Sequence, residues 1–171
     1  MKDIRLVITD IDGVWTDGGM YYDNSGNEWK KFNTSDSAGV LFCKKLGIQT
    51  AIMTGEVTAI VERRAAKLKI DHLFQGVANK LKLAQKLIDD LGIEWSEVAY
   101  IGDDINDILL LQKAGVAGCP SNAPKYVQQH ADIVLPTKGG EGAFRHFVEY
   151  FLGEEQLNKA LEIYLKETAQ K

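Results

Sequence analysis

The chain has 171 residues, of which 45% are hydrophobic and 26% are charged, and its formal net charge is −4. This length suits one domain with a single core and is short for two. The negative charge argues against nucleic-acid and anionic-membrane partners, and no apolar stretch is long enough to cross a bilayer. Cys43 and Cys119 form no C-x-x-C pair and are expected to be reduced thiols. We therefore expect one cytoplasmic domain over residues 1–171.

Short β-rich runs alternate along the chain with stretches of helical periodicity. Strands are predicted over 4–9, 49–53, 72–75, 98–102, 115–118 and 132–136. Helices are predicted over 36–46, 57–69, 80–91, 105–114 and 122–130, and the C-terminal helical tail 141–171 adds helices over 141–152 and 154–168. This alternation predicts an α/β fold with a doubly wound, mostly parallel, Rossmann-like sheet. Ligands of such sheets bind at the carboxyl ends of the strands.

The segment 18–33, GGMYYDNSGNEWKKFN, interrupts this alternation. It reads as two short strands around the turn NSGN, which predicts a β-hairpin flap. An isolated hairpin is marginally stable in water, and this one is rich in aromatic residues. We therefore expect it to pack against a neighbouring subunit.

Polar residues follow four of the predicted strands. The first strand is followed by Asp10 and Asp12, and the second by Thr54 and Gly55. Lys80 begins the helix after the third strand. The motif GDDIND after the fourth strand supplies Asp103, Asp104, Asn106 and Asp107. Parallel strands would bring all of these side chains to one rim of the sheet.

These residue types suit phosphoryl transfer. Asp10 and Asp12 point the same way in an extended chain, so one can attack phosphorus while the other protonates the leaving alcohol. Mg²⁺ would offset their charges, with Asp103 as a further ligand. Thr54 can hold phosphoryl oxygens at a helix N-terminus, and Lys80 can stabilise the charge on the transferring group.

Each feature also has a simpler explanation. The sequence DxDG could form a solvated turn, and Asp103 and Asp104 could only stabilise a helix N-terminus. Asn79 could be only an N-cap. Lys80 resists such an explanation, because a lysine in the first turn opposes the helix dipole. The order of all four features at strand ends favours a catalytic site.

The motifs DIDGV, MTG, Lys80 and GDDIND resemble those of the haloacid dehalogenase superfamily of phosphatases. The resemblance implies that Asp10 is the nucleophile and Asp12 the general acid and base. It implies that Thr54 and Lys80 bind the phosphoryl group. Mg²⁺ would be held by Asp10, by the Asp12 backbone carbonyl and by Asp103, with Asp104 and Asp107 as supporting residues. The spacing of the motifs leaves no room for a cap domain.

The segment 17–39, DGGMYYDNSGNEWKKFNTSDSAG, is similar to the capless sugar-acid phosphatases, which form tetramers. These enzymes act on 3-deoxy-D-manno-octulosonate 8-phosphate or 2-keto-3-deoxynononate 9-phosphate. The resemblance implies a homotetramer in which the loop 32–36 lines the substrate site and Arg64 of an adjacent chain pairs with the substrate carboxylate. The implied substrate-binding residues are Asn33, Thr34, Ser35, Asp36, Ser37, Gly55, Glu56, Arg64, Lys67 and Asn106.

The choice between the two sugar acids depends on a few positions. Glu56 and Lys67 resemble the nine-carbon branch, which serves sialic-acid-like synthesis, and the eight-carbon branch serves lipopolysaccharide synthesis. Glu141 and His146 in the segment GGEGAFRH depart from the eight-carbon pattern. We therefore favour the nine-carbon substrate, with the eight-carbon substrate as the alternative. From periodicity alone, Arg64 and Lys67 would belong to a solvated basic helix face.

Other functions fit the sequence less well. A phospho-aspartate receiver domain needs an aspartate after its third strand, and this chain has QGVANK there. A phosphomutase needs a cap to keep water from its intermediate. A catalytically silent subunit would leave the acid pair and Lys80 unexplained. A Mg²⁺-dependent phosphatase is therefore the preferred hypothesis.

Overall fold

The computed structural model describes residues 3–170 and contains a parallel six-stranded sheet. The strands are β1 (Leu6–Thr9), β4 (Gln49–Met53), β5 (His72–Phe74), β6 (Val98–Ile101), β7 (Val116–Cys119) and β8 (Ile133–Val134). Their order across the sheet is β5-β4-β1-β6-β7-β8. β1 is therefore central, between β4 and β6, and the chain reverses its winding direction there. The predicted doubly wound α/β fold is confirmed.

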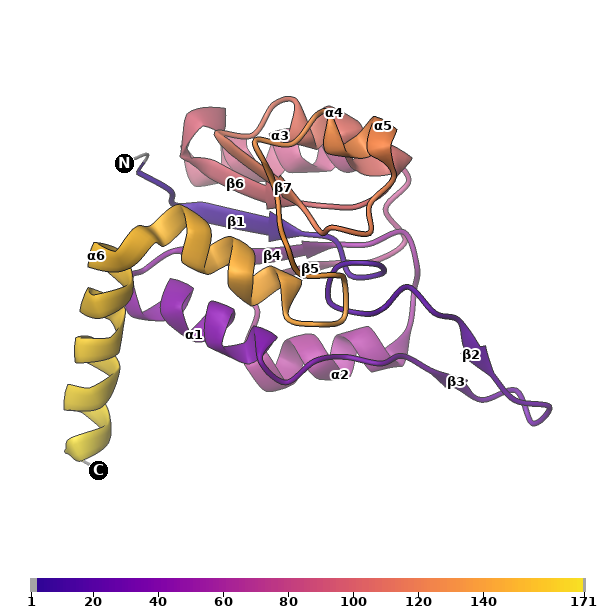
Figure 1. Cartoon of the computed structure of the whole chain (residues 1–171), viewed down its shortest axis with the longest axis horizontal. Coiled ribbons are helices and arrows are strands. Elements are labelled where there is room, and N and C mark those ends of the chain that lie inside the picture. The colour runs from indigo at the N-terminus through magenta and orange to yellow at the C-terminus, as the bar shows by residue number, and fades with distance from the viewer. Residues whose placement is uncertain (1–2, 171) are drawn as a thin grey trace.

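Helices cover both faces of the sheet (Figure 1). One face carries α1 (Asp36–Lys45), α2 (Ala59–Leu68) and the first part of α6 (Ala143–Ala169). The other carries α3 (Lys80–Leu91), α4 (Ile108–Leu111) and α5 (Lys125–Gln128). Alternate residues of the central strand enter the two cores: Val7 packs on the α1 side, whereas Leu6 and Ile8 pack on the α3 side. A strand apolar on both faces is typical of a covered parallel sheet.

Local sequence explains where several helices begin and end. The Thr58 hydroxyl accepts the Val61 N–H at the start of α2, and the Asn79 side chain accepts the Lys82 N–H at the start of α3. Gly92 ends α3 with φ 62°, a left-handed conformation that glycine adopts readily. Asn79 is thus an N-cap, as its sequence context suggested, and it places Lys80 in the first turn of α3.

Some predicted helices are shorter than expected. The range 105–114 contains a 3₁₀ turn (Ile105–Asp107) followed by α4, and the range 122–130 contains only α5. A second 3₁₀ turn (Trp95–Glu97) precedes β6. The predicted division of the tail at residue 153 is correct, because Gly153 has non-helical φ and ψ of 64° and 176° inside α6. No helix in residues 3–170 is long and apolar enough to cross a membrane.

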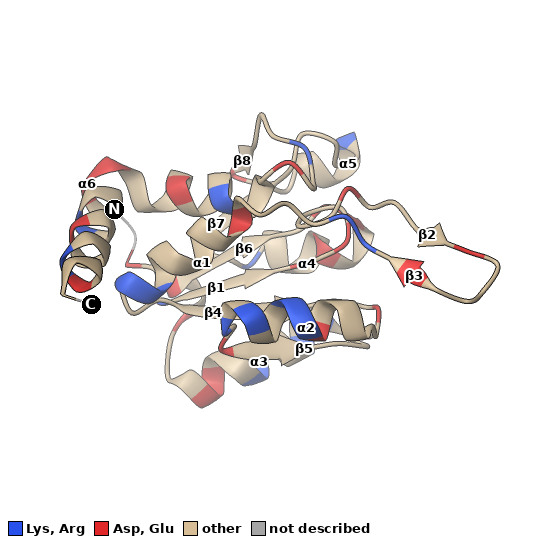
Figure 2. Ribbon diagram, turned by 90° about the horizontal axis from the view of Figure 1, so that it is seen from below, with Lys and Arg blue, Asp and Glu red and all other residues tan. Residues whose placement is uncertain are grey.

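The predicted hairpin forms beside the main sheet. β2 (Tyr21–Tyr22) pairs antiparallel with β3 (Glu28–Trp29) as a separate two-stranded sheet. The hairpin projects from the edge of the molecule where β1 ends (Figures 1 and 2). Its aromatic side chains Tyr21, Tyr22 and Trp29 are exposed. Figure 2 also shows that basic residues recur along α2.

Candidate active site

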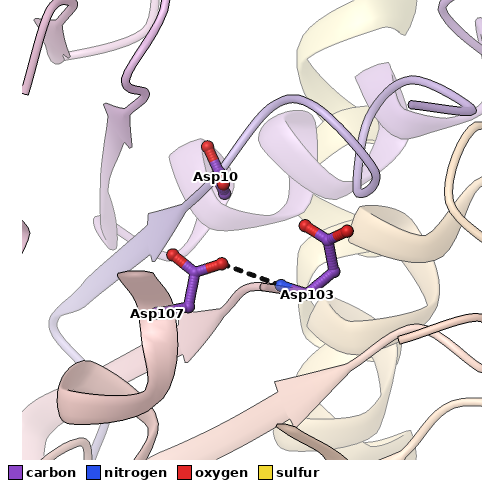
Figure 3. A group of neighbouring side chains, drawn as sticks. All are labelled: Asp10, Asp103 and Asp107. Carbon is purple, nitrogen blue, oxygen red and sulfur yellow. Dashed lines mark hydrogen bonds between the residues drawn. The ribbon is translucent and has the colours of Figure 1, made fainter. Parts of the chain in front are cut away.

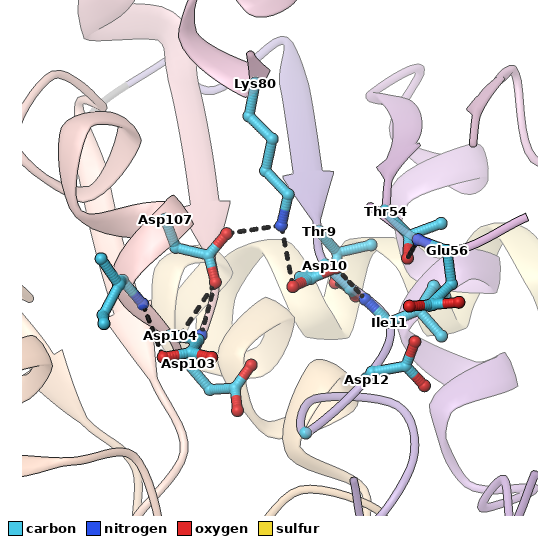
Figure 4. Close-up of polar contacts among 12 residues, drawn as sticks. Thr9, Asp10, Ile11, Asp12, Thr54, Glu56, Lys80, Asp103, Asp104 and Asp107 are labelled. Atoms are coloured by element: carbon cyan, nitrogen blue, oxygen red, sulfur yellow. Dashed lines mark hydrogen bonds and ion pairs between the residues drawn. The ribbon is translucent and has the colours of Figure 1, made fainter. Parts of the chain in front are cut away.

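Asp10 follows β1 directly and is buried at the centre of the rim. One carboxylate oxygen, Oδ1, accepts the Ile11 N–H at 2.7 Å. The other, Oδ2, lies 2.8 Å from Lys80 Nζ. Lys80 is itself buried and reaches this point from the start of α3 (Figure 4). The central strand and a neighbouring helix thus deliver an acid and a cation to one place.

Asp107 contacts both Lys80 and the loop that carries Asp103. Its Oδ1 accepts hydrogen bonds from Lys80 Nζ and from the Tyr100 hydroxyl, and its Oδ2 accepts the backbone N–H groups of Asp103 and Asp104. Four donors therefore occupy a fully buried carboxylate. Asp107 is consequently well placed to position Lys80 and the 103–104 loop, and has little capacity left to bind a metal directly.

Asp103 completes a group of three acids with Asp10 and Asp107, whose carboxylate oxygens lie within 4.8 Å of one another (Figure 3). Burial, together with the neighbouring carboxylates of Asp10, Asp107 and Asp104, raises the pKa of Asp103 to about 8. Burial and Asp107 raise the pKa of Asp10 to about 7, although Lys80 opposes this. Oδ1 of Asp103 is buried without a hydrogen-bond partner among the described residues. Hard oxygen ligands with unbalanced negative charge fit Mg²⁺.

Two glycines allow the acids to approach so closely. Gly13 has φ +80°, and a Cβ atom there would lie 1.9 Å from Asp103 Oδ2. A Cβ atom on Gly102 would lie 2.4 Å from the Asp107 carboxyl carbon. The glycine in DIDGV and the first residue of GDDIND are therefore required for packing around the carboxylates.

A cleft of about 310 Å³ opens beside these acids. It is lined by Asp10, Asp12, Gly13, Gly18, Thr54, Gly55, Glu56, Asp103, Asp104 and Asn106. Thr54 is buried at the end of β4, and its hydroxyl accepts the Glu56 N–H at 3.4 Å. Figure 4 shows Thr54 and Glu56 across the cleft from Asp107 and Asp103. The fold thus brings together residues from three strand ends that the sequence singled out.

The predicted substrate loop lies outside this cleft. The Asn33 carbonyl accepts a hydrogen bond from Arg64 Nη2 at 3.1 Å, and the Asn33 side chain accepts from the Ser35 backbone and hydroxyl. Thr34 is exposed, and its carbonyl accepts the Ser37 hydroxyl. These residues gather where α1 begins, with the Arg64 guanidinium over the Phe32 ring.

Another predicted substrate-binding residue, Asp36, is placed differently from the expectation. Asp36 is fully buried, and its Oδ1 accepts the Arg145 N–H in the first turn of α6. It therefore caps another helix of the same chain and does not reach the cleft. Lys67 is exposed on α2 and is not among the residues that line the cleft, whereas Glu56 is.

Sequence reasoning did not identify Lys30 as a site residue. Lys30 follows β3 in the hairpin, and its Nζ lies 2.6 Å from Asp12 Oδ1. The Thr16 hydroxyl contacts the same oxygen at 3.3 Å. The segment EWKKF contains a basic pair, but nothing in it distinguishes the buried Lys30 from the exposed Lys31.

Comparison with known proteins places this site in a family. Residues 70–146 match the model of the haloacid dehalogenase-like hydrolases. The 3-deoxy-D-manno-octulosonate 8-phosphate phosphatase KdsC of Escherichia coli is 39% identical over 151 residues, which are 88% of this chain and 80% of that protein. The chain belongs to the haloacid dehalogenase-like hydrolases.

Solved structures of related hydrolases agree over nearly the whole chain. A probable yrbi family phosphatase from Pseudomonas syringae has a TM-score of 0.91 at 42% identity, covering 96% of this chain and 94% of that chain. A 3-deoxy-D-manno-octulosonate 8-phosphate phosphatase from Moraxella catarrhalis, solved with magnesium ion, phosphate ion and a KDO molecule, has a TM-score of 0.89 at 36% identity, with the same coverage. These matches confirm the predicted fold, family and enzyme class of this haloacid dehalogenase-like hydrolase, a phosphoric monoester hydrolase. Together with the acidic group, they agree with the predicted Mg²⁺ cofactor.

Proposed function

We propose that this hydrolase removes the phosphate of 3-deoxy-D-manno-octulosonate 8-phosphate through an aspartyl phosphate on Asp10. The observation that carries the proposal is the buried Asp10 carboxylate, which lies 2.8 Å from Lys80 Nζ and beside Asp103 at the edge of a cleft. A carboxylate so placed can attack phosphorus, and a neighbouring ammonium can offset the charge of the transferring group.

The other cleft residues take complementary roles. Asp12 donates a proton to the departing sugar oxygen and later accepts one from the water that attacks the phospho-aspartate. The Thr54 hydroxyl and the Gly55 backbone bind phosphoryl oxygens. Asp107 holds Lys80 through its 2.6 Å contact, and so orients the cation toward Asp10.

Asp10, Asp103 and the Asp12 backbone carbonyl would hold the Mg²⁺ ion. When bound, the ion neutralises the carboxylates and stabilises negative charge on the phosphoryl oxygens. The raised pKa values of Asp10 and Asp103 fit this role, because burial and mutual repulsion oppose two ionised carboxylates until a cation balances them. Asp104 supports the ligand loop, since its carboxylate accepts the Ile105 N–H.

The related proteins change the preferred sugar acid. The Escherichia coli and Moraxella catarrhalis relatives are both named for the eight-carbon 8-phosphate. These relatives support the eight-carbon substrate, the alternative that the sequence left open, over the nine-carbon one.

We also propose that a neighbouring chain completes the open site in a homotetramer. The exposed hairpin aromatic residues support association, and the cleft has no domain of the same chain covering it in residues 3–170. Arg64 would then reach the substrate carboxylate of an adjacent chain, with the loop 32–36 beside it.

The first experiment compares kcat/KM for phosphate release from the eight-carbon 8-phosphate and the nine-carbon 9-phosphate in the presence of Mg²⁺. We expect at least a tenfold preference for the eight-carbon substrate, and loss of turnover when EDTA removes the metal. Asp10→Asn should abolish turnover and the hydroxylamine-labile phospho-enzyme together.

Each result has a definite consequence. A nine-carbon preference would overturn the substrate assignment and restore Glu56 as a specificity residue. A burst of phospho-enzyme without turnover would contradict the hydrolase. Turnover of neither sugar acid, with intact hydrolysis of p-nitrophenyl phosphate, would leave the phosphatase and reject the sugar-acid substrate.

A further inference from the structure

Lys30 is a cation that the hairpin buries against the catalytic rim. Its side chain is 1% exposed, and its Nζ lies 2.6 Å from Asp12 Oδ1 and 3.9 Å from Glu28 Oε1. The neighbouring Lys31 side chain is 66% exposed and lies 3.8 Å from Asp17. A buried lysine loses hydration and side-chain freedom, so a short contact with one specific carboxylate oxygen compensates for its burial.

Thr16 contacts the same Asp12 oxygen, and its own hydrogen-bond pattern shows which way the proton points. The Thr16 hydroxyl oxygen accepts the N–H groups of Gly13, at 3.4 Å, and Gly18, at 3.2 Å. These two donors occupy its lone pairs, so the hydroxyl hydrogen is directed to Asp12 Oδ1 at 3.3 Å. Oδ1 therefore accepts from both Lys30 and Thr16.

The second oxygen of the same carboxyl group is in a different environment. Oδ2 of Asp12 is buried and has no hydrogen-bond partner among residues 3–170, and Asp12 lines the cleft. The contacts of Lys30 and Thr16 therefore fix the orientation of the Asp12 carboxyl group through Oδ1 alone.

We propose that Lys30 is a positioning residue that, with Thr16, holds Oδ1 of Asp12 and thereby fixes the orientation of this carboxyl group beside the cleft. This inference rests on the proposed phosphatase function and deepens it. The hairpin is thus more than an association surface: it carries the group that orients the general acid. Because Lys30 follows β3, any displacement of the hairpin would also release Asp12.

Both chemical steps of the proposed function use the Asp12 carboxyl group. In the first step, a bond forms between Asp10 and phosphorus, the bond from phosphorus to the ester oxygen breaks, and the Asp12 carboxyl proton moves to that oxygen. In the second step, water attacks phosphorus, its proton returns to the Asp12 carboxylate, and the bond from phosphorus to Asp10 breaks. Asp12 ends as it began, and inorganic phosphate leaves.

Leaving groups of different basicity test the proposal. An alkoxide such as that of a sugar needs a proton as it departs, whereas p-nitrophenolate is stable without one. We expect Lys30→Met to lower kcat for the sugar-acid phosphate by about 10²-fold, within the range attributed to general acid catalysis. The same variant should lower kcat for p-nitrophenyl phosphate less than about threefold, a difference that follows from the same principle.

Matched variants control for folding and charge. Lys31→Met removes an adjacent, exposed charge and should leave both substrates unaffected. Lys30→Arg restores a donor and should recover much of the sugar-acid kcat. Thr16→Val removes the second donor to Oδ1 and should produce the same selective loss, which provides an independent test if Lys30→Met does not fold.

Loss of activity on both substrates in equal proportion would overturn the proposal, because Lys30 would then only maintain the site structure. Equal activity of Lys30→Met and wild type on the sugar-acid phosphate would overturn it as well. Failure of the wild-type enzyme on every phosphate ester would instead reject the proposed function. The two failures are therefore distinguishable in one set of assays.

Discussion

Glycine at position 13 determines how the acidic residues of the site can be arranged. Gly13 has a left-handed φ of +80° and lies so close to Asp103 that no side chain fits between them. Gly102 makes a similar approach to Asp107. The acids that carry the chemistry are thus brought together by residues without side chains, and their mutual repulsion is offset by Lys80 and by the expected metal.

Replacing Gly13 with alanine should lower activity, because the added methyl group would clash with a catalytic-site carboxylate. The new Cβ would lie 1.9 Å from Asp103 Oδ2, so we expect Asp103 to move and kcat/KM to fall by about 10²-fold or more. Gly26→Ala is the control, because Gly26 has φ +82° but nothing within 4 Å. Steady-state kinetics over a Mg²⁺ titration measures both variants. Equal effects of the two substitutions would mean that backbone strain, rather than the clash, is responsible.

At the level of secondary structure, one buried acid links two helices. Asp36 begins α1, and its carboxylate accepts the Arg145 N–H in the first turn of α6 at 3.1 Å. Gly39 lets the two helices approach, since a Cβ atom there would lie 3.0 Å from the Phe144 ring. This contact anchors the C-terminal helix beside the site. The glycine-rich segment before α6 is held there as well, because the Gly140 N–H donates to the Val14 carbonyl at 3.1 Å.

The Asp36 carboxyl group should make the stability of the fold depend on pH. Burial raises its pKa to about 6, although Arg145 and Arg64 oppose this. Between pH 4 and 6 the folded chain therefore keeps a proton that the unfolded chain releases, so stability falls as pH rises through this window. Relative to Asp36→Asn, which does not titrate, wild type should lose about 1–3 kcal/mol between pH 4 and pH 7. Urea unfolding of both proteins measures this difference, and a pH-independent difference would contradict the assigned pKa.

At the scale of the whole molecule, the hairpin is the feature that a monomer leaves unexplained. Tyr22 is 64% exposed, Trp29 50% and Met20 50%, and all three lie on a segment that projects from the rim of the site. Exposed aromatic residues gathered on one projecting element are typical of a protein interface. The open cleft lies at the base of this hairpin, so the same contact would cover the site.

Removing two of these aromatic side chains should weaken assembly. We expect the double substitution Tyr22→Ser and Trp29→Ser to shift the protein from a tetramer to smaller species in sedimentation velocity at micromolar concentration. Activity on the sugar-acid phosphate should fall with the tetramer, since the neighbouring chain would supply Arg64. Tyr150→Ser is the control, because Tyr150 is 49% exposed on α6 and lies away from the hairpin. A monomeric wild type would contradict the proposed assembly.

The order of the motifs and the fold class followed from the sequence because they depend on local patterns and on the rules of parallel sheets. Asp10, Thr54 and Asp103 each follow a strand, and adjacent parallel strands end at the same edge. Asn79 before Lys80 marked a helix start, and Gly153 marked the break in the tail. Each of these predictions needed only a few neighbouring residues or the connection between consecutive strands.

Tertiary structure alone decided the contacts between distant segments. Lys30 meets Asp12 across 18 positions, and Asp36 meets the start of α6 across 109. The sequence offered no means of separating Lys30 from Lys31, or of seeing that Asp36 is buried as a helix cap. Such pairings depend on how whole helices and strands pack together. A small shift in that packing decides which of two neighbouring side chains makes the contact. The residue types of the site were therefore readable from the sequence, whereas their orientation depended on the packing of the hairpin and α6.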